Sequence, residues 1–142
     1  MRIPSLRFFC AALVLASLAA GCKPPEAQDR HFTLTGIIKS SPGLRGKIER
    51  PNTVLFIIAS NVAGIPVAVK RIINPRLPTP YQMNEEDLVL PGPVWKGVMS
   101  VKVHLTTHGQ AGLILHGDLT GRHSGPVYCD DQNVDVTVDN EA

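Results

Sequence analysis

Histidines in the second half of the chain are the side chains best suited to hold a metal ion, since neutral imidazole is the commonest metal ligand. His104 and His108 are four positions apart, which on an extended strand means about 13 Å, too far to share one ion. If the chain reverses shortly after His108, a hairpin register places His104 opposite His116. The same register pairs Lys102 with Asp118. His104 and His116 are therefore the two candidate metal ligands, although two ligands alone make a poor site.

Cys129 is the other side chain with reactive chemistry in this half of the chain. A blue-copper site needs a cysteine followed by histidine and usually methionine, but neither residue type occurs after Cys129. The chain has no C-x-x-C or C-x-x-C-H motif, which excludes thioredoxin-type redox chemistry and covalent haem attachment. It also has no nucleophile elbow with a Ser-His-Asp order. We therefore predict no catalytic residues and no cofactor, so the protein is not expected to be an enzyme.

The first 21 residues have the pattern of a secretory signal peptide. Arg2 and Arg7 give a basic start, residues 8–20 are apolar or small, and Gly21-Cys22 follows. A helix over residues 8–20 would span about 20 Å, which is too short for a bilayer core of about 30 Å. We therefore predict a cleaved export signal over residues 1–21 rather than a transmembrane helix.

Residues 18–22, LAAGC, resemble the lipobox of bacterial lipoproteins. The resemblance implies cleavage between Gly21 and Cys22 and attachment of lipid, palmitate included, to Cys22. The favoured leucine three places before the cysteine is Ala19 here. In enterobacterial lipoproteins an aspartate after the cysteine retains the protein at the inner membrane, so Lys23 favours the outer membrane. We expect a lipid-anchored protein on the periplasmic side of one of the two membranes.

Charge and composition narrow the class of protein further. The 142-residue chain has 14 basic and 12 acidic side chains, and removal of Arg2 and Arg7 with the signal peptide leaves a neutral mature chain. This balance excludes a dedicated nucleic-acid-binding protein, which carries a strong basic excess. Twelve prolines exclude a helical bundle, because proline breaks helix interiors. With Cys22 lipidated, no disulfide framework is expected in the mature chain.

Short β-rich runs separated by Gly and Pro turns follow a polar tether at residues 22–30. Alternating or continuously apolar patterns predict strands over residues 31–39, 53–60, 67–73, 98–107, 113–119 and 133–139. Three prolines within residues 74–82 exclude a regular strand there. Asn84 and the acidic residues after it are compatible with an eight-residue helix. His104 falls on the strand face that we expect to meet solvent. The patterns together predict one all-β sandwich over residues 31–140.

Three segments carry a resemblance to a known family: LFIIASNVAGIPVAVKRI (55–72), LPTPYQMNEEDLVLPG (77–92) and GDLTGRHSGPV (117–127). They resemble the C-terminal immunoglobulin-like or cupredoxin-like domain of the tetratricopeptide protein of bacterial cytochrome c maturation, a component of the haem-ligation complex. Their order and spacing hold over nearly the whole mature chain. The specific parts are the P-x-A-V-K-R element at residues 66–71 and a structural motif made of Gly117, Asp118, Leu119, Gly121, Ser124, Gly125 and Pro126.

The resemblance implies an immunoglobulin-like or cupredoxin-like β-sandwich of about seven strands. It also implies an accessory or assembly role in c-type cytochrome biogenesis, through contacts with other maturation proteins rather than catalysis. The helical-repeat half that contacts apocytochrome in the family has no counterpart in this sequence, and Ile65 and Leu88–Leu90 replace family methionines. The alternative is a metal or haem carrier that uses the histidines. The membrane, reached through the lipid anchor, is the other expected partner, and no nucleic acid or small-molecule substrate is expected.

Overall fold

The computed structural model describes residues 31–142, so the predicted signal peptide, the predicted lipidation site Cys22 and the predicted tether lie outside the described residues. Strands dominate this part of the chain: β1 (Leu34–Ser40), β2 (Val54–Asn61), β3 (Pro66–Ile73), β4 (Thr79–Met83), β5 (Met99–Thr106), β6 (Leu119–Arg122) and β7 (Val136–Glu141). The helical elements are one turn each: η1 (Pro42–Leu44), α1 (Arg45–Ile48) and η2 (Glu85–Asp87). None of these described helices is long and apolar enough to cross a membrane. The predicted all-β class and the strand number are confirmed.

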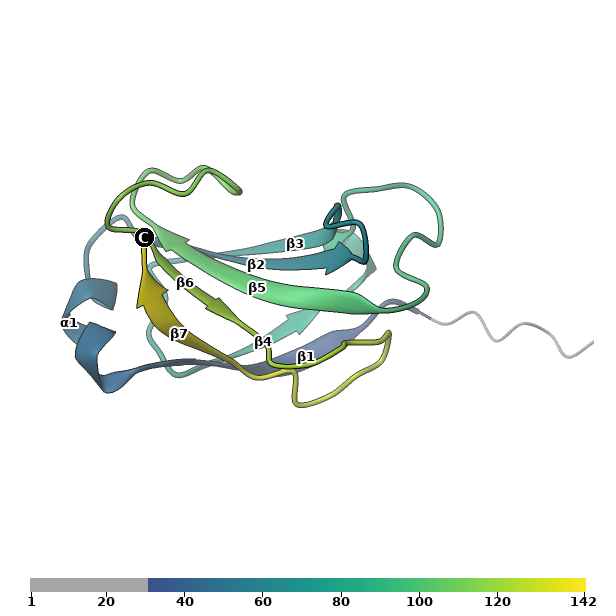
Figure 1. The fold of residues 1–142 in the computed structure, drawn as a ribbon, viewed down its shortest axis with the longest axis horizontal. Helices are drawn as coiled ribbons and strands as arrows, with labels where there is room; N and C mark the ends of the chain where they lie inside the picture. Colours follow the sequence, from purple (N-terminus) through teal and green to yellow (C-terminus); the bar gives the residue numbers. More distant parts are fainter. Residues whose placement is uncertain (1–30) are drawn as a thin grey trace, which may run out of the picture.

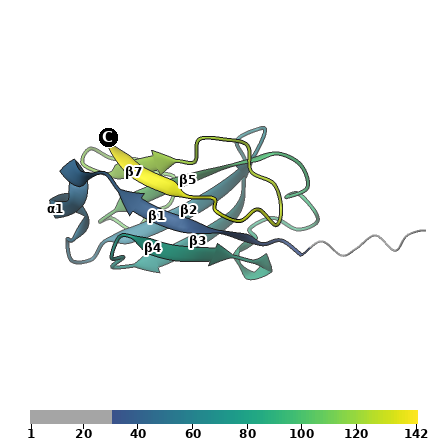
Figure 2. The same ribbon diagram turned by 90° about the horizontal axis from the view of Figure 1, so that it is seen from below.

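The seven strands form one sheet in the order β3-β2-β5-β6-β7-β1-β4, which curls into two facing layers (Figures 1 and 2). Neighbouring strands are antiparallel except β1 and β7, which run parallel with Ile38 opposite Val136. In Figure 1 the layer of β3, β2 and β5 lies above the layer of β1 and β4, and β6 and β7 join the two. The space between the layers is filled by apolar side chains, among them Phe32, Leu34, Ile38, Leu55, Ile57, Val101, Val103 and Val136.

β2 shows why a continuously apolar run becomes a central strand. It pairs with β3 along one edge and β5 along the other, and its side chains on both faces are buried or half-buried. Leu55, Ile57 and Ala59 are completely buried in the core between the layers. Phe56 points to the opposite face and is also buried, with its ring centroid 6.4 Å from that of His104 on β5. The outer face of β2 therefore helps to bury a histidine of the neighbouring strand.

The exclusion of a strand from residues 74–82 is wrong, because β4 contains Pro80 and pairs with β1. Pro80 lies opposite Ile37 in this ladder. β4 is the last strand of the sheet and has a neighbour on one side only. An edge strand accepts proline where a central strand does not, since one row of its amide groups has no partner strand.

Two other elements differ from the sequence prediction. The apolar run at residues 113–119 is a loop up to Asp118, and β6 begins at Leu119. The helix compatible with Asn84 is the single turn η2. Asn84 caps that turn, because its side-chain oxygen accepts from the Glu86 amide at 2.9 Å and its own amide donates to Asp87 at 2.9 Å. The turn ends at once in the extended residue Leu88.

Candidate functional site

The connection between β5 and β6, residues 107–118, sets the register of the two strands that carry the candidate metal ligands. His104 lies opposite Thr120, and Lys102 lies opposite Arg122. The predicted pairing of His104 with His116 is therefore wrong. The predicted pairing of Lys102 with Asp118 is wrong for the same reason. Both pairings require the chain to reverse shortly after His108, but the chain leaves β5 at Thr106 and makes a wide loop before β6. His116 lies in this loop and is exposed.

The loop gathers a different set of side chains into a cluster, which we call the Asp118 cluster: His104, His108 and Asp118. The Nε2 atoms of both histidines lie 2.9 Å from Oδ2 of Asp118. His104 and His108 come together because β5 ends between them, so the spacing of an extended strand does not apply. The prediction that these two histidines are too far apart to share an ion is wrong for this reason.

Asp118 is the centre of the cluster and is only 5% exposed. Burial, the largest single influence, raises the pKa of this carboxyl group. It is outweighed by hydrogen bonds from the Leu115 amide at 2.8 Å, from both cluster histidines and from the Thr106 hydroxyl, which together hold the pKa of Asp118 well below its usual range. Asp118 is therefore a buried carboxylate at neutral pH.

The tautomers of the two histidines follow from this charge. An ionised carboxylate only accepts hydrogen bonds, so Nε2 of His104 and of His108 must each carry a hydrogen. Nδ1 of His108 accepts from the Gln110 amide at 3.3 Å, which agrees with that tautomer. Nδ1 of His104 is buried and has no hydrogen-bond partner, and it is the one such side-chain atom among residues 31–142. His104, predicted on the solvent face, is 4% exposed.

The structural motif inferred from the family resemblance divides between the cluster and the next turn. Gly117 takes a positive φ of 89°, and its amide donates to the carbonyl of Ala142, so the C-terminal residue fixes the chain just before Asp118. Leu119 is buried, and Gly121 lies where β6 meets β7. The remaining members, Ser124, Gly125 and Pro126, form the turn that leads to Val127, which is hydrogen-bonded to Met99.

A metal ion is the ligand that the cluster's chemistry suits. One ligand atom each from His104, His108 and Asp118 lies within 4.8 Å of the other two. Sequence reasoning found His104 but gave it the wrong partners. The available signal was the glycine-rich connection with Gly109, Gly112 and Gly117, which favours a wide loop over a tight hairpin.

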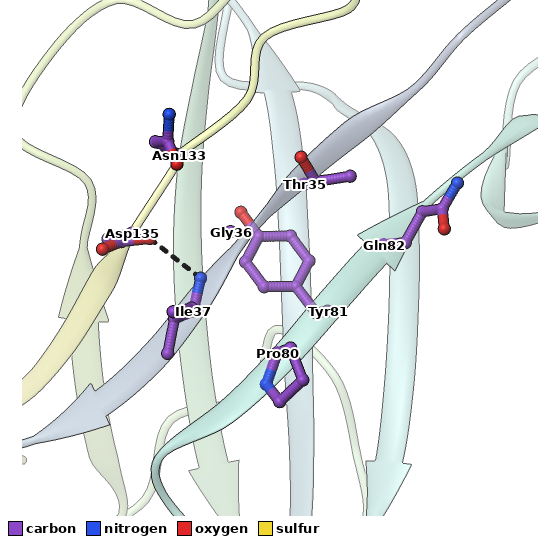
Figure 3. Close-up of a pocket in the computed structure, with 8 residues that line it drawn as sticks. All are labelled: Thr35, Gly36, Ile37, Pro80, Tyr81, Gln82, Asn133 and Asp135. Carbon is purple, nitrogen blue, oxygen red and sulfur yellow. Dashed lines mark hydrogen bonds between the residues drawn. The ribbon is translucent and has the colours of Figure 1, made fainter.

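A hollow of about 490 Å³ lies over β1 and β4, away from the Asp118 cluster, and is shown in Figure 3. The ring of Tyr81 lies beside Gly36, and its hydroxyl donates to the Val134 carbonyl at 2.7 Å. Burial raises the pKa of Tyr81, and the charge of Asp135 raises it further. Asp135 itself accepts from the Ile37 amide at 2.9 Å. These hydrogen bonds connect β1 and β4 with the segment that leads into β7, so the residues that line this hollow stabilise the fold.

The seven-stranded sandwich is an immunoglobulin-like domain. Residues 34–139 match the family model of the Ig-like domain of cytochrome c-type biogenesis protein H, and the chain belongs to this family. The family resemblance read from the sequence is confirmed, and it supports a role in c-type cytochrome biogenesis. Comparison with curated proteins gives no significant match, and comparison with solved structures gives none either.

Proposed function

We propose that the protein is a lipid-anchored module on the periplasmic side of a bacterial membrane that assists c-type cytochrome biogenesis by binding maturation proteins, without catalysis. The observation that carries this proposal is the family match, which spans residues 34–139 and so takes in the sandwich almost from end to end. The family implies interaction with cytochrome c maturation components. The lipid anchor follows from the lipobox resemblance at residues 18–22, with Lys23 favouring the outer membrane.

The surface best suited to a docking role is an apolar run at Leu113, Ile114 and Leu115. These consecutive side chains are 45%, 55% and 46% exposed. A run of three exposed large apolar residues is costly in water and is retained where it serves binding. Figure 1 shows that the loop between β5 and β6 rises clear of the sheet at the end that holds the C-terminus. The Leu115 amide donates to Asp118, so the cluster holds the apolar run in place.

The charge next to the apolar run indicates the chemistry of its partner. Ile114 lines a groove of about 540 Å³ over β5 and β6, together with Lys102, Arg122 and one acidic residue, Asp139, so the cations are in excess. Lys102 and Arg122 are exposed and lie opposite each other across the two strands. An apolar side chain beside two cations fits an apolar surface flanked by acidic groups. We therefore propose that the partner presents such a surface to this loop.

Ile114→Asp is expected to reduce recovery of cytochrome c maturation proteins with the membrane-extracted protein by about tenfold or more, because truncating an interface anchor costs about 1–2 kcal/mol or more. Stability is expected to change by less than about 0.5 kcal/mol, since the residue is exposed. Quantitative mass spectrometry of affinity-purified complexes measures the recovery. The matched control is Val62→Asp in the β2–β3 turn, where Val62 is 85% exposed. Equal recovery with both variants would rule out the loop, and absence of maturation proteins from the wild-type complex would rule out the function.

Cys22→Ser is expected to leave the precursor unprocessed, or to release a lipid-free protein from the membrane, because the lipid is attached through the thiol of Cys22. Labelling with radioactive palmitate and membrane fractionation measure the effect. Cys129→Ser is the control and is expected to keep both the label and the membrane location. Processed, membrane-bound Cys22→Ser protein would show that the lipobox assignment is wrong. Fractionation of the wild type on a density gradient decides between inner and outer membrane.

A further inference from the structure

We infer that His104, His108 and Asp118 form a binding site for one divalent transition-metal ion, represented by Zn²⁺, at the base of the β5–β6 loop. This inference goes beyond the proposed docking function, which requires no metal. It replaces the His104–His116 pair of the sequence prediction with a set of three side chains. The set rests on geometry, on the kind of donor atoms and on the charge of the buried carboxylate.

Two of the three separations between donor atoms suit a single ion, and the third is no more than 4.8 Å. Each histidine Nε2 lies 2.9 Å from Oδ2 of Asp118. Zinc binds imidazole nitrogen and carboxylate oxygen at about 2.0–2.2 Å, so two such atoms at this separation subtend an angle of about 90° at the ion. An increase of a few tenths of an ångström gives the spacing of a tetrahedral site. His108 supplies this freedom, because it is only half-buried and lies in the loop.

The donor set selects the class of metal. Two imidazoles with one carboxylate suit zinc and its first-row neighbours, whereas magnesium and calcium prefer oxygen ligands throughout. The carboxylate is already oriented by the Leu115 amide and the Thr106 hydroxyl, which is the support that metal-binding carboxylates usually have.

Asp118 adds charge complementarity to the site. Its ion-pair partners among the described residues are His104 and His108, which are cationic only when protonated. A divalent ion bound between them would give this buried carboxylate a permanent cationic partner. With neutral histidines, the net charge of the three side chains is −1. With the divalent ion bound, the net charge of the site is +1.

Metal binding at Nε2 requires the hydrogen on each ring to move to Nδ1. The hydrogen bonds from Nε2 of both rings to Asp118 are then replaced by bonds to the ion, and the buried Nδ1 of His104 becomes an N–H group without an acceptor. In His108 the 3.3 Å contact from the Gln110 amide is given up. The tautomer of both rings therefore reports directly on occupancy.

The test is calorimetric titration of Zn²⁺ into the purified protein, produced without a histidine tag, with Mg²⁺ as the ion control. The wild type is expected to bind one Zn²⁺ with micromolar or tighter affinity and not to bind Mg²⁺. His108→Gln keeps a hydrogen-bond donor for Asp118 but removes the imidazole, so it is expected to fold normally, by circular dichroism, and to bind at least about 100-fold more weakly. His108→Ala is expected to lose binding likewise. The matched control is His116→Ala, in the same loop, which is expected to bind as the wild type does.

Nitrogen-15 NMR of the imidazole rings supplies a second readout, which a purely structural role would not change. Before zinc is added, the rings of His104 and His108 are expected to carry hydrogen on Nε2. After addition both are expected to carry it on Nδ1, and His123 is expected to be unaffected. The inference is overturned by a wild type that does not bind zinc, by full affinity in His108→Gln, by loss of binding in His116→Ala, or by unchanged tautomers.

Discussion

Gly121→Ala is expected to prevent the domain from folding, or to lower the free energy of unfolding by at least about 3 kcal/mol. A Cβ atom at this position would lie 2.1 Å from the carbonyl oxygen of Thr137 and 2.8 Å from its carbonyl carbon. Both atoms belong to the backbone of β7, and the next nearest atom is Cα of Val138 at 3.1 Å. The pairing of β6 and β7 shifts register between Thr120 and Gly121, so the strands approach closely at this point. A rigid neighbour of this kind cannot yield without breaking the ladder.

Two other glycines of the same motif serve as controls for this prediction. Gly125→Ala is expected to change stability by less than about 0.5 kcal/mol, because the nearest atom to its added Cβ is 3.9 Å away. Gly117→Ala meets no atom within 4 Å but has a φ of +89°, so a loss of about 1 kcal/mol is expected from backbone strain. Urea denaturation of the three variants measures the order. Equal stability of Gly121→Ala and Gly125→Ala would contradict the steric argument.

The different expected effects of these glycine substitutions indicate which residues of the family motif stabilise the fold. Gly121 is required because two strands touch there, and Gly117 because the chain turns with a positive φ before Asp118. Asp118 is required because it accepts several hydrogen bonds at the base of the loop. The motif by which the family is recognised thus consists of residues that stabilise the fold. For this reason it predicts the architecture well and the surface that binds a partner poorly.

Local pattern was enough to predict most of the strands. The continuous apolar run of β2 and the alternation of Met99, Val101, Val103 and Leu105 on β5 reflect burial that each strand carries in its own sequence. β4 was missed because the tolerance of Pro80 depends on its strand being at the edge of the sheet. Edge position is a property of the whole topology, and no local pattern encodes it.

The site was predicted less well because it depends on register and on cover from other strands. A change in the length of one loop moves every cross-strand pair, and this change replaced His116 with Thr120 opposite His104. The burial of His104 arises from Phe56 on β2 and from the loop that carries His108. Alternation along β5 predicts which face His104 lies on, but it does not predict that this face is covered.

Asp118→Ala is expected to lower the free energy of unfolding at pH 7 by about 3 kcal/mol or more, because several donors then lose their acceptor. His104 is buried, so water cannot fully replace the carboxylate as the acceptor for its Nε2. Asp118→Asn keeps one acceptor oxygen but turns an amide group toward donors, so a loss between that of alanine and zero is expected. The exposed Asp139→Asn is the matched control and is expected to change stability by less than about 0.5 kcal/mol.

The pH dependence of this loss identifies the charge as its cause. The pKa of Asp118 is lowered in the folded state, so its stabilising contribution is fully present above its ordinary value of about 3.9 and is lost as the pH falls toward the folded-state value. The difference in stability between the wild type and Asp118→Asn is therefore expected to shrink as the pH falls from about 4 toward 2. Urea denaturation at each pH measures that difference. If it stays constant down to pH 2, the contribution of Asp118 does not depend on its charge, and the carboxylate-centred description of the cluster is wrong.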